Sequence, residues 1–212
     1  MNLIEMRLYQ FLEAVDSDKP APGGGSVAAY VSALGVALSR MTGHLTINKK
    51  KFGELDETSQ KEFIKNFDSL KSLQDRLKDI VDEDTVSFTK VMAAYALPKE
   101  TDKDKEIRNK AIADATLEAT KCPMEAALIA YQALSITPSL IEHANKNAIS
   151  DLASGMFLLQ SGMKCSILNV KINLAGLADE TLVKEFSEKC ESITKQADEI
   201  INKNMEIIEG NL

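Results

Sequence analysis

The chain has 212 residues, a formal net charge of −7 and a pI near 5.0. This acidic balance, with no long basic run, excludes a protein that binds nucleic acid through a broad basic face. No apolar run reaches the ~18 residues that a membrane-spanning helix needs, and residues 1–6 lack the apolar centre of a signal peptide, so we expect no membrane association.

The composition favours an all-helical protein. Hydrophobic residues make up 44 % of the chain, but aromatic residues only 5 %, with no Trp, so aliphatic side chains and Ala must build the core. The three cysteines, Cys122, Cys165 and Cys190, are widely spaced and are interpreted as small buried hydrophobes in a reducing compartment. We expect a cytoplasmic, all-α protein with one domain over residues 1–212, an up-and-down bundle of long helices around buried apolar helices.

The first predicted helix, over residues 4–15, follows Asn2, which with Glu5 resembles a capping box. Residues 20–26, Pro-Ala-Pro-Gly-Gly-Gly-Ser, are expected to form an extended turn, because two prolines and three glycines disfavour a helix and permit unusual backbone angles. Residues 27–41 are apolar nearly all round and rich in small residues, which predicts a buried, closely approached helix.

Two long helices are expected next. An apolar stripe with helical spacing covers residues 57–96. A second helix is predicted to start at a Thr101 cap and to continue to Pro138, with Pro123 expected to kink or split it.

Two more helices are expected in the last third of the chain. The nearly all-apolar residues 152–174 predict a second buried helix, and Asp179 is expected to cap a final amphipathic helix that ends near Gly210. No segment alternates with period two, so no strand is expected.

One acidic residue interrupts the apolar face of the helix predicted over residues 57–96. Position 84 lies between Val81 and Phe88 on the core side, and an aspartate, Asp84, occupies it, with Asp82 on the flank of the same face. Carboxylates are rarely buried without partners. The functional interpretation is a catalytic carboxylate whose pKa is shifted by burial or by a basic neighbour. The structural alternative is a cap or a break in the helix.

Two other features indicate a binding site. Backbone N–H groups at a helix start attract acceptor groups, and glycines allow a ligand to come close, which makes binding candidates of Pro22, Gly23, Gly24, Gly25 and Ser26. The alternative is a tight turn between packed helices. Polar residues in apolar surroundings form a second candidate set, Asn145, Asn147, Ser150, Asp151, Asn169 and Asn173. Their structural alternative is helix capping by Ser150 and Asp151 and satisfaction of buried backbone groups by the asparagines.

Metal chemistry is poorly supported. The only histidines, His44 and His143, belong to no metal-ligand pattern, so no metal site is expected. The Lys49-Lys50-Lys51 cluster is interpreted as a solvated loop end, with an anion contact as the alternative.

Several segments together resemble the formiminotetrahydrofolate cyclodeaminase family, which includes the C-terminal domain of formiminotransferase-cyclodeaminase and stand-alone bacterial methenyltetrahydrofolate cyclohydrolases. The matching stretches stand in the family's order and are PAPGGGS at 20–26, VDEDTVSF at 81–88, LPKET at 97–101, IRNKAI at 107–112, NKNAISD at 145–151 and NVKINL at 169–174. The chain departs from the family pattern at Glu83 and Thr85, where alanines are common, and at His143-Ala144-Asn145, where the family often has Gly-Asn.

The resemblance implies a homodimer, a folate site lined by the glycine turn and the Asp-containing helix, and no cofactor beyond the tetrahydrofolate substrate, which would be polyglutamylated. It also implies that the formiminotransferase half is absent. Asp82 and Asp84 match the family's paired-Asp motif, and Arg108 matches its arginine after the Leu-Pro-Lys loop. Arg108 is then expected to grip a tail carboxylate, with an ion pair to Asp104 as the alternative and with Lys99 and Lys171 as weaker candidates for the tail.

The expected reaction is cyclodeamination of 5-formiminotetrahydrofolate to 5,10-methenyltetrahydrofolate with release of ammonia, in which a carboxylate moves the protons. The alternative is a methenyltetrahydrofolate cyclohydrolase that gives 10-formyltetrahydrofolate. A non-catalytic helical binding protein is the alternative from a different class.

Overall fold

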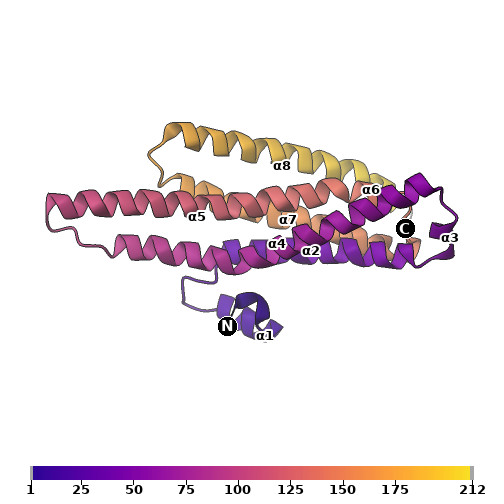
Figure 1. The fold of residues 1–212 in the computed structure, drawn as a ribbon, viewed down its shortest axis with the longest axis horizontal. Helices are drawn as coiled ribbons and strands as arrows, with labels where there is room; N and C mark the ends of the chain where they lie inside the picture. The colour runs from indigo at the N-terminus through magenta and orange to yellow at the C-terminus, as the bar shows by residue number, and fades with distance from the viewer. Residues whose placement is uncertain (1, 211–212) are drawn as a thin grey trace.

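A computed structural model describes residues 2–210 as a bundle in which successive long helices run in opposite directions (Figure 1). The described residues contain no strand. The all-α, up-and-down architecture is therefore confirmed. The long helices are α2 (Gly24–Ile47), α4 (Glu57–Tyr95), α5 (Asp102–Ile136), α7 (Ile149–Leu174) and α8 (Glu180–Glu209). The short ones are η1 (Leu3–Glu5), α1 (Leu8–Val15), α3 (Lys50–Gly53), α6 (Pro138–Ile141) and η2 (Lys146–Ala148).

Helices α2 and α7 pack against each other along small residues, as their composition predicted. A Cβ atom added to Gly35 would lie 2.8 Å from the carbonyl oxygen of Gly155, and one added to Gly155 would lie 2.8 Å from that of Gly35. Gly162 approaches the carbonyl oxygen of Ala28 equally closely. Helices α4 and α5 pack against this pair, and α8 packs against α5 and α7 (Figure 1). The antiparallel α2–α7 pair is thus the buried centre of the bundle.

The predicted helix starts at Thr101 and Asp179 are confirmed. Thr101 and Asp104 form a reciprocal capping box, with the Asp104 backbone N–H donating to Thr101 Oγ1 at 3.1 Å and the Thr101 backbone N–H donating to Asp104 at 3.0 Å. The Asp179 carboxylate accepts from the backbone N–H groups of Thr181 and Leu182. In each of these caps the interacting residues are at most three positions apart in the chain, so the caps can be predicted from the sequence.

The first predicted helix differs from the structure in two ways. The side chain of Asn2 makes no capping hydrogen bond, and the segment splits into η1 and α1. The carboxylate of Asp82 takes the capping role instead, since it accepts from the backbone N–H of Leu3 at 2.5 Å and of Ile4 at 3.4 Å. A partner almost eighty residues away in the chain has replaced the local cap.

The glycine turn also differs from expectation, because α2 already begins at Gly24. Residues 20–23 precede the helix, with Gly23 extended, and Gly24, Gly25 and Ser26 form the first helical turn. The described residues have no positive φ, so these glycines are not required by backbone conformation.

Helix α5 runs through Pro123 without splitting. A proline cannot donate the backbone hydrogen bond to the residue four positions earlier, which here leaves the carbonyl oxygen of Ala119 without its helical donor. Asn173 of α7 supplies the missing donor, since its Nδ2 lies 2.8 Å from the Ala119 oxygen. A side chain from the neighbouring helix thus replaces the hydrogen bond that Pro123 removes.

One helical stretch, Asp102–Ile141, is long and apolar enough to cross a membrane by length and composition, with a mean hydropathy of 1.2 in its 18-residue window. The sequence analysis expected no such stretch. Half of this window is buried inside the structure, and α5 packs against α4 and α7, as a core helix does. Of the three cysteines, Cys122 and Cys190 are buried as expected, whereas Cys165 is exposed.

Candidate functional site

Asp84 of α4 docks on the first turn of α2. Its Oδ2 accepts a hydrogen bond from the backbone N–H of Ser26 at 2.9 Å and from the Ser26 hydroxyl at 3.1 Å. The Ser26 hydroxyl is also 3.3 Å from Oγ1 of Thr85. The first N–H groups of a helix have no intrahelical acceptor, and the positive end of the helix dipole favours a carboxylate there. The sequence placed Asp84 on the core side, and the structure shows what it meets.

Gly25 and Gly24 make room for neighbouring helices at this point. A Cβ atom on Gly25 would lie 2.1 Å from Asp84 Oδ1, so the carboxylate occupies the space of a side chain. A Cβ on the exposed Gly24 would lie 3.3 Å from Nδ2 of Asn169. At Gly25 the lack of a side chain thus serves the packing of α4 against α2, in agreement with the structural alternative of a tight turn between packed helices. Gly24 and Asn169 form the open side of the same cluster.

Burial raises the pKa of the Asp84 carboxyl, although the two hydrogen bonds from Ser26 act in the opposite direction. Burial also raises the pKa of the Cys122 thiol to about 12, and the nearby charges of Asp84, Glu83 and Glu125 add to this shift. The thiol therefore stays protonated beside the carboxylate. A half-buried carboxyl with a raised pKa beside an open surface is the arrangement that acid–base catalysis needs.

Glu83, which departs from the family's pattern, is occupied by an ion pair. Arg76 donates to Glu83 through its two terminal nitrogens at 2.6 and 2.8 Å, and to Glu125 of α5 through Nε and one terminal nitrogen at 2.7 and 2.8 Å. Glu83 therefore does not compete with Asp84 for the role of acid or base. Arg76 was not predicted from the sequence, although its position seven residues before Glu83 puts both side chains on one face of α4.

Asp82 does not belong to the Asp84 cluster. Its carboxylate holds the backbone N–H groups of Leu3 and Ile4, as described above. Consecutive residues of a helix are rotated by about 100°, so side chains two positions apart point to nearly opposite sides. Of the two predicted catalytic acids, the structure therefore places only Asp84 against the glycine-rich start of α2.

Pro22, Gly23 and Asn173 are the next candidates. Pro22 is buried and follows a cis peptide bond, and Gly23 is the N-cap of α2. The Nδ2 of Asn173 is bound to the carbonyl of Ala119, which is the structural alternative for this residue.

Arg108 lies at the α4–α5 connection. Its Nε and one terminal nitrogen donate to the carbonyl oxygen of Tyr95 at 3.3 and 3.2 Å, and its guanidinium lies 5.5 Å from the Tyr95 ring centre. The alternative ion pair with Asp104 is wrong, since the Asp104 carboxylate accepts from Thr101 instead. Residues 84 and 95 are separated by ~16 Å along α4, so Arg108 is remote from the Asp84 carboxylate.

Asn147, Ser150 and Asp151 lie at the opposite end of α2. Thr42 Oγ1 donates to the carbonyl of Ala148 at 3.1 Å, which places the start of α7 beside the last third of α2, ~27 Å along the helix from Gly24. Within one chain the structure does not bring these residues to Asp84. The capping alternative for Ser150 and Asp151 is also wrong, because Ala148 occupies the N-cap position of α7.

Comparison with known proteins places the chain in a family. The model of the formiminotransferase-cyclodeaminase family matches residues 7–192. The chain belongs to this family. Methenyltetrahydrofolate cyclohydrolase of Methylorubrum extorquens is 33 % identical over 88 % of both chains. Formimidoyltransferase-cyclodeaminase of Rattus norvegicus is 30 % identical over 92 % of this chain, which spans only 36 % of the rat enzyme.

A solved structure shares the fold. The crystal structure of formiminotetrahydrofolate cyclodeaminase from Thermotoga maritima is similar with a TM-score of 0.84 and 28 % sequence identity, over 97 % of each chain. Members of the formiminotransferase-cyclodeaminase family that match along most of their length thus include proteins named for either activity. Among the described residues, no group of three or more His, Cys, Asp or Glu side chains is placed to hold a metal ion.

Proposed function

We propose that the protein is a tetrahydrofolate-dependent enzyme that converts 5-formiminotetrahydrofolate to 5,10-methenyltetrahydrofolate and ammonia. The observation that carries the proposal is the Asp84 carboxylate, half-buried on the start of α2, with a pKa raised by burial. The exposed Gly24 leaves the neighbouring surface open to a flat ligand, and Asn169 borders it. The surface is thus bordered by two polar groups, the carboxyl of Asp84, which can act as acid or base, and the amide of Asn169.

The chemistry requires two proton movements. N10 of the folate attacks the formimino carbon and loses its proton, and the amino group of the resulting tetrahedral adduct must gain a proton before it leaves as ammonia. Asp84 accepts the first proton and donates it to the leaving nitrogen, so the enzyme returns to its starting state. A raised pKa suits this exchange, because a carboxyl near the working pH both accepts and donates, and such catalysis contributes ~100- to 10,000-fold.

The second candidate activity is that of a methenyltetrahydrofolate cyclohydrolase. It is favoured by the similarity to the M. extorquens cyclohydrolase along 88 % of both chains. In this reaction Asp84 takes a proton from the water that attacks the methenyl carbon and donates it to N5 as the bond between N5 and that carbon breaks. The hydroxyl of the adduct loses its proton to solvent, which gives 10-formyltetrahydrofolate. Formation or loss of the methenyl chromophore, followed spectrophotometrically with each substrate, separates the two activities.

The test of the site compares two matched variants. Asp84→Asn keeps the volume and an acceptor oxygen for Ser26 but removes the titrating group, so we expect kcat to fall by ~100- to 10,000-fold. Asp82→Asn, two residues away on the same helix, should leave kcat within a few-fold. Wild-type turnover in Asp84→Asn would overturn the proposal. Undetectable folate binding and turnover in the wild type would instead favour a non-catalytic helical protein.

We propose further that the protein forms a homodimer. Large apolar side chains are exposed on α7, with Leu168 65 % and Ile172 74 % accessible, and on α1, with Leu8 70 % and Leu12 68 % accessible. Exposed large apolar side chains that lie four residues apart on one helix can form an interface, and a second copy of the chain is the partner that the family resemblance implies. Light scattering after gel filtration measures the mass, and Ile172→Glu should lower it towards that of one chain.

The remaining parts of the proposal concern the ligand and the compartment. The substrate is a polyglutamylated tetrahydrofolate, bound without any further cofactor, membrane or nucleic acid. Arg108 binds the glutamate tail, because that tail is at the far end of the folate from the pterin, just as Arg108 is remote from Asp84. The free cysteines suit the cytoplasm.

A further inference from the structure

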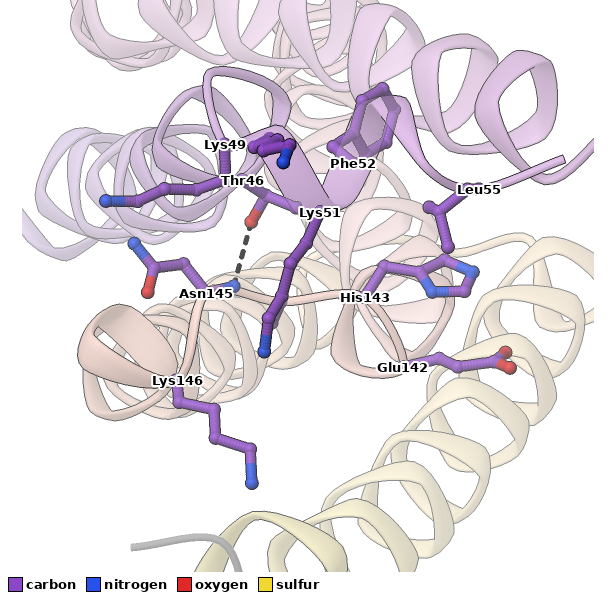
Figure 2. A pocket seen from close by; sticks show the side chains of 11 residues that line it. Thr46, Lys49, Lys51, Phe52, Leu55, Glu142, His143, Asn145 and Lys146 are labelled. Atoms are coloured by element: carbon purple, nitrogen blue, oxygen red, sulfur yellow. Dashed lines mark hydrogen bonds between the residues drawn. The ribbon is translucent and has the colours of Figure 1, made fainter. Parts of the chain in front are cut away.

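A cavity of about 600 Å³ lies at the other end of α2 from Asp84. It is enclosed by the end of α2, by α3 and by the segment between α6 and η2 (Figure 2). Its lining consists of Thr46, Lys49, Lys50, Lys51, Phe52, Leu55, Glu142, His143, Ala144, Asn145 and Lys146. Because α2 spans residues 24–47, the cavity is more than ~30 Å from the Asp84 cluster in the same chain.

Four exposed lysines, at positions 49, 50, 51 and 146, line this cavity, whereas Glu142 is its only acidic lining residue. Lys50 is 3.8 Å from Glu54. For the other three lysines, no carboxylate of the described part of the chain lies within ion-pair distance. Figure 2 shows the Lys51 side chain crossing the space between Asn145 and His143, with its ammonium on the side of the Lys146 chain. A chain with net charge −7 thus carries a local excess of positive charge around one hollow.

The wall behind the lysines is apolar and ordered. Phe52 is 7 % exposed, and its ring centre is 5.2 Å from that of Phe63, which in turn is 6.4 Å from the His143 ring. Opposite, the backbone N–H of Asn145 donates to Thr46 Oγ1 at 3.0 Å, which ties the segment after α6 to the end of α2. Ligand sites combine such preformed apolar walls with a few polar groups, and their volumes are of this size.

We propose that this cavity binds a phosphorylated small molecule the size of a nucleotide. Lysine ammonium groups bind phosphate as point charges, whereas planar carboxylates are gripped best by the fork of an arginine, and the cavity has four lysines and no arginine. The apolar wall of Phe52 and Leu55 receives the uncharged part of the ligand. The side chains of Lys49, Lys50 and Lys51 are exposed, so the phosphate binds at the mouth of the cavity. Within one chain this site lies at the opposite end of α2 from Asp84.

The probe for this site is ATP, titrated into the full chain by calorimetry at low ionic strength, where charge interactions are least screened. The test variant is Lys51→Ala combined with Lys146→Ala. The matched control is Lys61→Ala combined with Lys184→Ala, which changes the net charge equally but removes exposed lysines paired with Glu57 and Glu188. We expect the test variant to bind ATP ~10-fold or more weakly than the wild type, and the control to bind within twofold.

Three results would overturn the proposal. Equal weakening in the test and control variants would show attraction to overall charge alone. Tighter binding of tri-γ-glutamate than of ATP would assign the site to carboxylates. Absence of ATP binding to the wild type would overturn the proposal by itself, and a lower melting temperature of the test variant than of the control would then assign the lysines to the negative end of the α2 dipole. Folate turnover without ATP should stay at the wild-type rate in the control variant and in Lys51→Ala alone, which separates this site from the proposed function.

Discussion

Gly25 and Asp84 are in such close contact that a Cβ atom on the glycine would lie 2.1 Å from the carboxylate oxygen. The carboxylate therefore takes the place of a side chain on α2, and this is how it reaches the backbone N–H of Ser26. The close packing of α4 on α2 at Gly25 therefore sets the position of the proposed catalytic acid.

Gly25→Ala should push Asp84 away from Ser26 and lower kcat by ~100-fold, the effect of a displacement of about 1 Å at a reacting group. Gly53→Ala is the matched control, because a Cβ there meets nothing within 4 Å. Steady-state kinetics at saturating folate measures the effect, and circular dichroism checks that the bundle still forms. Unchanged turnover in a folded Gly25→Ala protein would contradict the assigned role of the contact.

The raised pKa of Asp84 predicts a pH-dependent cost in stability. A carboxyl whose pKa is higher in the folded than in the unfolded chain binds more protons when folded, so stability falls as pH rises through that interval. Asp84→Asn should therefore melt above the wild type at pH 7, because the amide carries no charge that burial could penalise. Below the unfolded pKa both side chains are neutral, and the difference should vanish. A gain that persists unchanged at pH 3 would contradict this explanation.

Arg108→Ala should weaken binding of polyglutamylated tetrahydrofolate by ~1.5–3 kcal/mol, the range for hydrogen bonds to a charged group. Loss of the two hydrogen bonds to the Tyr95 carbonyl should lower the melting temperature only slightly. Lys105→Ala is the matched control, since it removes the same charge from an exposed pair with Asp102 on the same helix. Fluorescence titration with mono- and triglutamyl folates measures the effect. Equal losses for both ligands would argue against a contact with the tail.

Asn173 and Pro123 should be energetically coupled. Asn173→Leu leaves the Ala119 carbonyl without a donor and should cost ~1–3 kcal/mol of folding free energy. In a Pro123→Ala background, residue 123 supplies the helical N–H itself, so the same replacement should cost much less. Chemical unfolding of the four proteins of this cycle measures the coupling. Additive losses would show that Asn173 does not compensate for the proline.

Elements that depend on neighbours in the chain were predictable. The boundaries of α4 and α8 follow from apolar periodicity and, for α8, from the Asp179 cap, and the box of Thr101 and Asp104 marks the start of α5. The position of Asp84 on the core side is likewise a matter of helical spacing. Asn2 was mispredicted because its local pattern competes with the Asp82 carboxylate, which the sequence places far away.

Only the tertiary structure decided what each polar residue meets. Asp82 and Asp84, two positions apart on α4, bind the N-terminal segment and the start of α2 respectively. Asn173 of α7 donates to the Ala119 carbonyl of α5, which Pro123 leaves without its helical donor. Residues of one family motif, Asn147, Ser150 and Asp151, lie at the opposite end of α2 from Asp84, and Lys51 and Lys146 share a cavity. The physical reason is that helical periodicity and capping act within about four residues, whereas the antiparallel packing of helices sets which distant residues share one end of the bundle.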